Sequence, residues 1–305
     1  MSLWQRRRVR RIGTFAGLAV ALFALVPPST AAANTITSHN WSGYAVHRSG
    51  VEFRTVVASW RQPAGSCTPG NRSYSAFWVG IGGYSLTARA LEQIGTELDC
   101  ENDGTESIYA WYELVPSTSR KIRMTVDAGD LLTAGVGVAG KRVTLTLADA
   151  TRHEAFARTV TVKIVDTSSA EWIAEAPSDC SSASRCTALT LADFSEVAFS
   201  DAWATTSADG TGAIGSSLWD TTRIVLGHAA RAGALVAGTG HATPSALTSA
   251  GSGFTVKYSR AAGGGAPTTP AGGAGSGVGA GSGGGAGSGG AAPGTGPGGP
   301  PPTVS

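Results

Sequence analysis

Short runs of alternating apolar and polar residues recur along this 305-residue chain and restrict its fold more than any other feature. Each run is rich in β-branched or aromatic residues and is bounded by Gly, Pro, Asn or Asp, which is typical of strands joined by turns. No long stretch keeps helical spacing with proper caps. The runs are RTVVASW (54–60), SYSAFWVGI (73–81), SIYAWYELV (107–115), RVTLTLAD (142–149), ARTVTVKIV (157–165), EVAFSDAW (196–203), TRIVLGH (222–228) and FTVKYS (254–259).

These runs predict an all-β fold, a two-sheet antiparallel β-sandwich of the concanavalin-like or jelly-roll-like kind, because half-buried strands must pack their apolar faces together. Asp103-Gly104 lies between the segments LEQIG and IYAWYE and predicts a hairpin that joins them. A sandwich of this kind leaves one broad sheet face available for a ligand cleft.

The two ends of the chain differ from its centre. Residues 1–33 combine five arginines, a short apolar run and a small-residue exit at Ala31 to Ala33, the order of a secretory signal peptide. We therefore expect export, cleavage after Ala33 and no stable insertion in a membrane afterwards. Residues 263–305 are rich in Gly, Ala, Ser and Pro and predict a disordered tail. The sandwich domain is then expected over residues 34–262.

Charge and cysteine content limit the partners. Loss of the five arginines changes the formal net charge from +2 to −3, and no basic stripe remains for nucleic acid. The four cysteines, an even number in an exported chain, predict two disulfides. The short loop between Cys180 and Cys186 favours that pair, which leaves Cys67 with Cys100. A zinc site is the rival interpretation, but there is no CxxC and no nearby histidine.

Several common chemistries lack their sequence signals. The chain has no GxSxG elbow for a serine hydrolase, and no phosphate-binding or calcium-binding loop. His153-Glu154 begins like a zincin helix but has no second histidine four residues later. We therefore expect neither a metal nor a cofactor. Acid and amide side chains in an aromatic setting remain.

That setting comes from three segments. SAFWVGIGG carries Trp78, ALEQIG carries Gln93, and IYAWYELVP carries Trp111 and Glu113. In strand phase, Trp111 and Glu113 emerge on the same face. The segment SAEWIAEAP likewise places Glu171 and Glu175 on one face with Ile173 between them. Unpaired carboxylates are costly to bury, so this clustering points to a functional surface.

An ordered set of motifs resembles the glutamic peptidases, or eqolisins. The motifs are NWSGY at 40–44, AFWVGIGG at 76–83, ALEQIG at 90–95, AWYELVP at 110–116 and AEWIAE at 170–175. The resemblance implies a Gln93–Glu175 catalytic dyad, with Trp78, Trp111 and Glu113 lining the substrate cleft. Gly82 and Tyr109 differ from the family pattern, which often has acids there.

The function implied is that of a secreted, monomeric endopeptidase acting on proteins or peptides. Glu175 would activate water, and the neutral Gln93 amide would stabilise the tetrahedral intermediate, with a preference for acidic pH. Two alternatives remain at this stage. One is a non-enzymatic lectin-like module in which Trp78 and Trp111 stack on sugars. The other is a glycoside hydrolase that uses Glu113 and Glu175 as its carboxylate pair.

Overall fold

The computed structural model describes residues 33–85, 87–182, 185–208, 210–227 and 240–260, which form eighteen strands and contain no helix. Nothing in this part of the chain is a helix long and apolar enough to cross a membrane. The predicted signal peptide and the predicted tail lie outside the described residues, so these boundaries stay predictions. The all-β prediction is confirmed.

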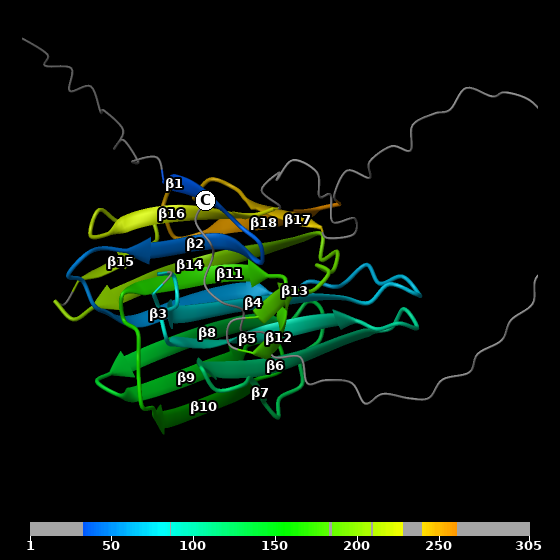
Figure 1. The fold of residues 1–305 in the computed structure, drawn as a ribbon, viewed down its shortest axis with the longest axis horizontal. Helices are drawn as coiled ribbons and strands as arrows, with labels where there is room; N and C mark the ends of the chain where they lie inside the picture. Colours follow the sequence, from blue (N-terminus) through cyan, green and yellow to red (C-terminus); the bar gives the residue numbers. More distant parts are fainter. Residues whose placement is uncertain (1–32, 86, 183–184, 209, 228–239, 261–305) are drawn as a thin grey trace, which may run out of the picture. The chain divides into compact units, whose positions relative to one another are not determined.

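Fourteen of the strands follow one another in a continuous antiparallel sheet (Figure 1). The order is β10 (Glu154–Thr161), β9 (Arg142–Asp149), β8 (Leu131–Ala139), β3 (Phe53–Arg61), β14 (Glu196–Thr206), β18 (Phe254–Ser259), β17 (His241–Pro244), β16 (Asp220–Leu226), β2 (Trp41–His47), β11 (Ser169–Glu175), β4 (Ser73–Gly82), β5 (Leu91–Cys100), β6 (Glu106–Val115) and β7 (Arg120–Lys121). Off this path, β1 (Asn34–Ser38) pairs in parallel with β16, and β15 (Thr211–Ala213) pairs with β14. The strands β12 (Ser178–Ser182) and β13 (Arg185–Ala188) form a separate two-stranded sheet.

The long sheet curls so that one half packs on the other. Strand β4 packs against β3 and β8, and β5 packs against β8 and β9, as Figure 1 allows the reader to follow. Large aromatic side chains fill the space between these layers, among them Trp60, Phe77, Trp172 and Phe199. Burying each such side chain stabilises the fold by about 1.5–3 kcal/mol.

Strict alternation separates this core from a second apolar cluster on the opposite face of β16, β2, β11, β4, β5 and β6. Along β6, Tyr112 belongs to the main core and Trp111 to the second cluster, as the two-residue period predicts. Along β11, Trp172 and Ile173 divide in the same way. The second cluster consists of Trp41, Ala45, Ala76, Trp78, Leu91, Trp111, Ile173 and Ile224.

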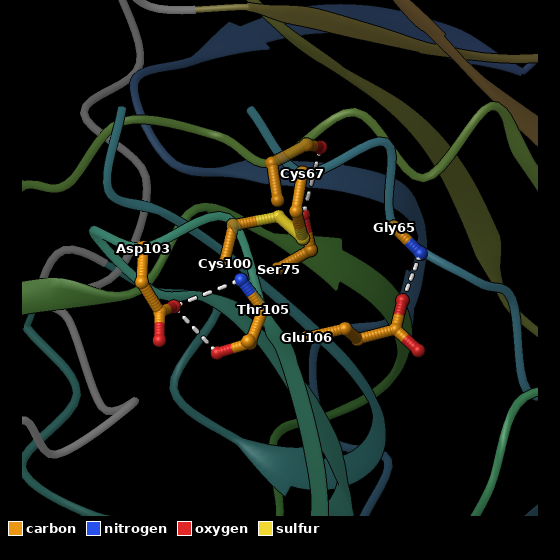
Figure 2. Close-up of a disulfide and its surroundings, with 8 residues drawn as sticks. Gly65, Cys67, Ser75, Cys100, Asp103, Thr105 and Glu106 are labelled. Atoms are coloured by element: carbon orange, nitrogen blue, oxygen red, sulfur yellow. Dashed lines mark hydrogen bonds between the residues drawn. A yellow bond between two sulfur atoms is a disulfide. The ribbon is translucent and has the colours of Figure 1, made fainter. Parts of the chain in front are cut away.

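The predicted disulfide between Cys67 and Cys100 is present (Figure 2). It joins the segment that follows β3 to the last residue of β5. Beside it, the Gly65 backbone N–H donates to the Glu106 carboxylate at the start of β6. These two links hold the chain after β3 against the β5–β6 hairpin.

The predicted turn at Asp103-Gly104 joins β5 to β6. Asp103 Oδ1 accepts hydrogen bonds from Thr105 N at 2.9 Å and Thr105 Oγ1 at 2.7 Å (Figure 2). Gly104 has φ of 87°, a left-handed conformation in which a Cβ is unfavourable. The hairpin fixes the register of the two strands that carry Gln93 and Glu113.

One sequence expectation needs correction. The run ARTVTVKIV was expected to be strand to Val165, but β10 ends at Thr161. Val162 and Val165 turn inward and pack partly against the main core, so the chain leaves the sheet edge there.

The predicted disulfide between Cys180 and Cys186 is not tested by the structure. The backbones of these two residues are paired in register, but their side chains lie outside the described part. That disulfide stays a prediction.

Candidate active site

Strand register brings the three predicted polar residues onto one face. In the ladders, Glu175 lies opposite Ala76, and Gln93 lies opposite Gly80 on one side and Glu113 on the other. Directly opposed residues, and residues two apart along a strand, share a sheet face. Glu175, Gln93 and Glu113 therefore all project on the face of the second apolar cluster.

A glycine separates the two predicted cleft tryptophans. Trp78 and Trp111 both lie opposite Gly95, one on each side of β5. A Cβ at Gly95 would lie 2.1 Å from the Phe77 carbonyl oxygen and 2.6 Å from Trp78 Cβ. Glycine is therefore required here for β4 and β5 to approach as closely as they do.

The Glu175 carboxylate is held by two neutral donors. Asn40 Nδ2 donates to Oε1 at 3.0 Å, and Trp78 Nε1 donates to Oε2 at 2.8 Å. Only 1% of Glu175 is exposed. A carboxylate offers about four acceptor positions, so each oxygen keeps one for a further donor such as a water molecule.

Burial is the main influence on the pKa of Glu175. Desolvation raises this pKa well above its usual range, and the nearby Glu113 and Glu97 carboxyls raise it further. The hydrogen bonds from Trp78 and Asn40 act in the opposite direction because they favour the ionised form. The two donors therefore offset part of the effect of burial and make Glu175 more readily ionised.

Gln93 is paired with Glu113. Gln93 Nε2 donates to Glu113 Oε2 at 2.8 Å, and both residues are buried. Desolvation raises the pKa of Glu113 to about 7, against the lowering effect of the Gln93 amide. A primary amide has two N–H bonds, so one remains to donate elsewhere while the other is bound to Glu113.

The aromatic side chains form the wall around these polar groups. Trp41 packs edge-on against Trp78, with ring centroids 5.1 Å apart and planes at 78°. Trp78 and Trp111 are both 0% exposed. Sugar-binding platforms present the open face of an aromatic ring, so this burial argues against the lectin-like alternative. The low-dielectric surroundings instead strengthen every electrostatic interaction at Glu175.

Glu171 shares the face, as the sequence predicts, but its carboxylate forms no hydrogen bond with Glu175, Gln93 or Glu113. It lies opposite Gly80, so a glycine stands between Glu171 and Gln93 in the register. Desolvation raises the pKa of Glu171 well above its usual range, and the other acids that act on it are Asp166 and Glu92. Glu171 therefore interacts electrostatically with the acids near the start of β11 and not with Glu175 at its end.

The two departures from the family pattern have structural partners. At Gly82, an added Cβ would lie 2.6 Å from Asp166 Cβ, so Asp166 from another segment occupies that space. Asp166 Oδ2 accepts a hydrogen bond from Gly83 N at 3.3 Å. Tyr109 lies opposite Glu97, and the Lys121 ammonium lies 3.4 Å from the Tyr109 ring centroid.

Sequence reasoning missed two residues of this site. Glu97 lies four residues after Gln93 and opposite Ala76, on the same face as Glu175, and desolvation followed by Asp99 raises its pKa well above the usual range. The four-residue spacing was the available signal. Asn40 belongs to the NWSGY motif, and nothing in that motif indicates that its amide reaches Glu175.

Within the described ranges, no group of three or more His, Cys, Asp or Glu side chains is arranged to hold a metal ion. The polar chemistry of the site thus consists of carboxyl, amide and indole groups. Such a set can hold a water molecule, accept its proton and donate to a developing oxyanion.

Comparison with protein families decides the affiliation: the peptidase A4 family matches residues 39–232, most of the described chain. The chain belongs to the peptidase A4 family. It is a glutamic-type peptidase, which confirms the resemblance drawn from the motifs. The matched range contains all five predicted catalytic and cleft residues.

Solved structures agree on the fold. A scytalido-glutamic peptidase with a transition-state analogue inhibitor superposes with a TM-score of 0.57 at 25% identity, covering 72% of this chain and 98% of that one. SCP-B, an eqolisin in complex with the tripeptide Ala-Ile-His, gives 0.52 at 23% identity with the same coverage. A search of curated proteins finds no match. The all-β fold of this peptidase, a continuous antiparallel sheet that curls on itself, is thus like the eqolisin sandwich, although its two layers belong to one sheet and not to the two separate sheets expected from the sequence.

Proposed function

We propose that this peptidase is a secreted endopeptidase in which Glu175 is the general base and Gln93 the oxyanion donor. The observation that carries the proposal is the Glu175 carboxylate, buried, held by two neutral donors and placed on the same face as the Gln93–Glu113 pair. Peptide ligands in the structures of two similar peptidases support peptides as the substrate class.

In the first step, ionised Glu175 accepts a proton from a bound water as the water oxygen attacks the peptide carbonyl carbon. A C–O bond forms, and the carbonyl π electrons move to oxygen. The N–H of Gln93 that is not bound to Glu113 donates to this oxyanion. Because glutamine carries no charge at any pH, it stabilises the oxyanion without repelling Glu175.

In the second step, the tetrahedral intermediate collapses and the C–N bond breaks. Protonated Glu175 returns its proton to the leaving amine, so one carboxyl serves as base and then as acid. The products are a carboxylic acid and an amine, and Glu175 is ionised again. No covalent acyl-enzyme forms at any point.

Mildly acidic conditions suit this arrangement. Glu113, whose pKa burial raises to about 7, is neutral below that pH and then exerts no charge on Glu175 or on the oxyanion. Above pH 7 its carboxylate would repel both. Ionisation of Glu113 therefore bounds the working range on the alkaline side, and on the acid side activity persists as far as the Trp78 and Asn40 donors, which favour the ionised form, keep Glu175 ionised.

Export from the cell is part of the proposal. The Cys67–Cys100 disulfide supports it, because disulfides persist in oxidising compartments. Cleavage after Ala33 and a dispensable tail at 263–305 follow from the composition of those segments. Mass spectrometry of secreted protein, and a chain truncated after residue 262 that still cleaves casein, would support both boundaries.

The direct test is casein cleavage by the purified chain and by Glu175→Gln. The amide keeps the shape of the side chain but cannot accept the proton, so cleavage should be abolished while the circular dichroism spectrum is unchanged. Inhibitors of serine, cysteine and metallopeptidases should leave the native chain active. Activity that survives in Glu175→Gln would exclude Glu175 as the base.

A further inference from the structure

We propose that Ser38 and Asn40 form a relay that positions the Glu175 carboxylate for its role as base. The inference deepens the function proposed above and rests on it. Neither residue contacts the predicted oxyanion donor, so both are positioning residues. The relay begins at Ser38, at the end of β1, and its inner link joins Asn40 to Glu175 of β11, 135 residues apart along the chain.

The inner link is the hydrogen bond from Asn40 Nδ2 to Glu175 Oε1 at 3.0 Å. Trp78 binds the other oxygen, Oε2. With one donor on each oxygen, the carboxylate plane cannot rotate about its terminal bond without breaking a buried hydrogen bond. If only the indole were present, this rotation would move the free oxygen relative to the attacking water. Asn40 therefore fixes the second oxygen.

The outer link fixes the orientation of the Asn40 amide. A flipped amide would place Oδ1 against the Glu175 carboxylate, which is repulsive. Ser38 Oγ donates to Asn40 Oδ1 at 3.2 Å and accepts from the backbone N–H groups of Asn40 at 3.3 Å and Trp41 at 3.1 Å. A serine hydroxyl has one donor and two acceptor positions, so all of its capacity is used. Its proton is thereby directed to Oδ1, and Nδ2 is left to face Glu175.

The backbone ties the relay to the strand that carries the carboxylate. The Asn40 carbonyl oxygen accepts from Ala176 N at 2.8 Å, directly after Glu175, and Trp41 lies opposite Glu175 in the β2–β11 ladder. Ser38 is 1% exposed and Asn40 is 5% exposed. If the Ser38 hydroxyl served only to bind the backbone N–H groups at the start of β2, it would not also need to donate to the side-chain amide of Asn40.

The charged groups around Glu175 show why a neutral donor stands at position 40. Glu113 on β6 and Glu97 on β5 both act on Glu175 as like charges, while Trp78 on β4 and Trp41 on β2 are uncharged. Glu171, on its own strand, lies four residues away. The Asn40 amide donates to the ionised form of Glu175 and so counteracts the two like charges. A cation at this position would favour the ionised form so strongly that Glu175 could not take up a proton again.

The first experiment measures kcat/KM against pH for Asn40→Ala, Ser38→Ala and Ser38→Thr. Loss of the Asn40 donor should move the acid limb up by about one pH unit, which corresponds to roughly tenfold lower kcat/KM below it. Ser38→Ala should move the limb in the same direction by less. Ser38→Thr keeps the hydroxyl and should restore the native limb.

Ser75→Ala is the matched control. Ser75 is equally buried, and its Oγ donates to the Ala192 carbonyl oxygen at 3.0 Å, away from Glu175. This variant should lose stability to a degree similar to Ser38→Ala and leave the acid limb in place. An acid limb that stays fixed in Asn40→Ala, or that moves equally in Ser75→Ala, would overturn the relay.

A second measurement needs no catalysis. The free energy of unfolding is measured across pH for the native chain and for Asn40→Ala. The same pair is then measured with Glu175→Gln added to both proteins. Removing the donor raises the folded-state pKa of Glu175 further, so the loss should grow as pH rises and Glu175 ionises. It should not vary with pH in Glu175→Gln. The same pH trend in both backgrounds would contradict the relay. If the trend depends on Glu175 but the native chain does not cleave peptides, the relay would stand and the proposed function would be rejected.

Discussion

Gln93 donates its 2.8 Å hydrogen bond to the carboxylate directly opposite it on the next strand, Glu113. The contact commits one N–H of the amide and orients the other. It also connects the proposed oxyanion donor to a group whose pKa, raised by burial, is about 7. The charge next to the oxyanion therefore depends on pH in the physiological range.

Substitution Glu113→Gln tests this connection. The new amide oxygen can still accept from Gln93 but never ionises, so kcat/KM at pH 5 should remain within about tenfold of the native value. The alkaline limb near pH 7 should move to higher pH, since no carboxylate remains to repel Glu175 and the oxyanion. A pH profile of peptide cleavage checks both. An alkaline limb that stays at pH 7 would assign it to another group.

Stability should fall as pH rises. Burial raises the pKa of Glu92 from 4.5 to about 8 and that of Asp99 from 3.8 to about 6, in each case mainly by desolvation. A carboxyl whose pKa is raised by folding favours the folded state below its unfolded pKa, and this contribution is lost as pH rises through the folded pKa. Urea unfolding should thus give a lower free energy at pH 9 than at pH 5.

Glu92→Gln identifies the main group in that trend. Without the ionisable carboxyl, the decline between pH 6 and 9 should become shallower, since each unit of removed pKa difference is about 1.4 kcal/mol. A free energy of unfolding that is constant or rises over this range in the native chain would show that these carboxyls are not buried as described.

The close approach of β4 and β5 predicts an unequal response of two strand glycines to alanine. Gly95→Ala places a methyl group 2.1 Å from the Phe77 carbonyl oxygen, a backbone atom that cannot move freely. We expect a loss of about 1–3 kcal/mol in unfolding free energy and reduced cleavage, because Trp78 must shift. At Gly137 the nearest atoms lie 4.0 Å from the added Cβ, so Gly137→Ala should stay within about 0.5 kcal/mol of the native chain. Equal losses in the two variants would contradict the strand packing.

The Cys67–Cys100 disulfide closes a long loop, with a sequence separation of 33. Replacing both cysteines by alanine should lower the free energy of unfolding by about 3–4 kcal/mol on the chain-entropy account. Denaturant titrations measure this loss. Non-reducing peptide mapping of the same protein should also recover a Cys180–Cys186 peptide, and a crossed pairing would disprove the assignment.

The sequence predicts a strand most readily where buried and exposed residues alternate along it. RVTLTLAD exposes one face and buries the other, so its period is visible. WSGYAVH of β2 is buried on nearly all sides, and LLTAGVGVA of β8 contains Gly135 and Gly137, which weaken any strand signal. Local patterns carry no information on such positions, because contacts with neighbouring strands decide them.

For the site, the sequence places Glu175, Gln93 and Glu113 on one surface through motif resemblance and strand phase. It does not predict that Asn40 reaches Glu175, because that contact joins residues 135 apart. Glu97 is missed for a related reason: its burial depends on Ala76 and Tyr109 in the two adjoining strands. Register is a tertiary property, and only the folded sheet determines which polar groups share a row.

The most direct test of the dyad is the kcat/KM of Gln93→Glu on a peptide substrate, measured from pH 3 to 8 against the native chain. Glutamate matches glutamine in length and shape, but its ionised form has no donor and adds a negative charge near the oxyanion. Loss of one such donor alone costs about 10²- to 10³-fold in rate. We expect at least that loss at pH 7, with partial recovery only in acid where the new carboxyl is protonated. Native-like kcat/KM at pH 7 in Gln93→Glu would contradict the proposed dyad.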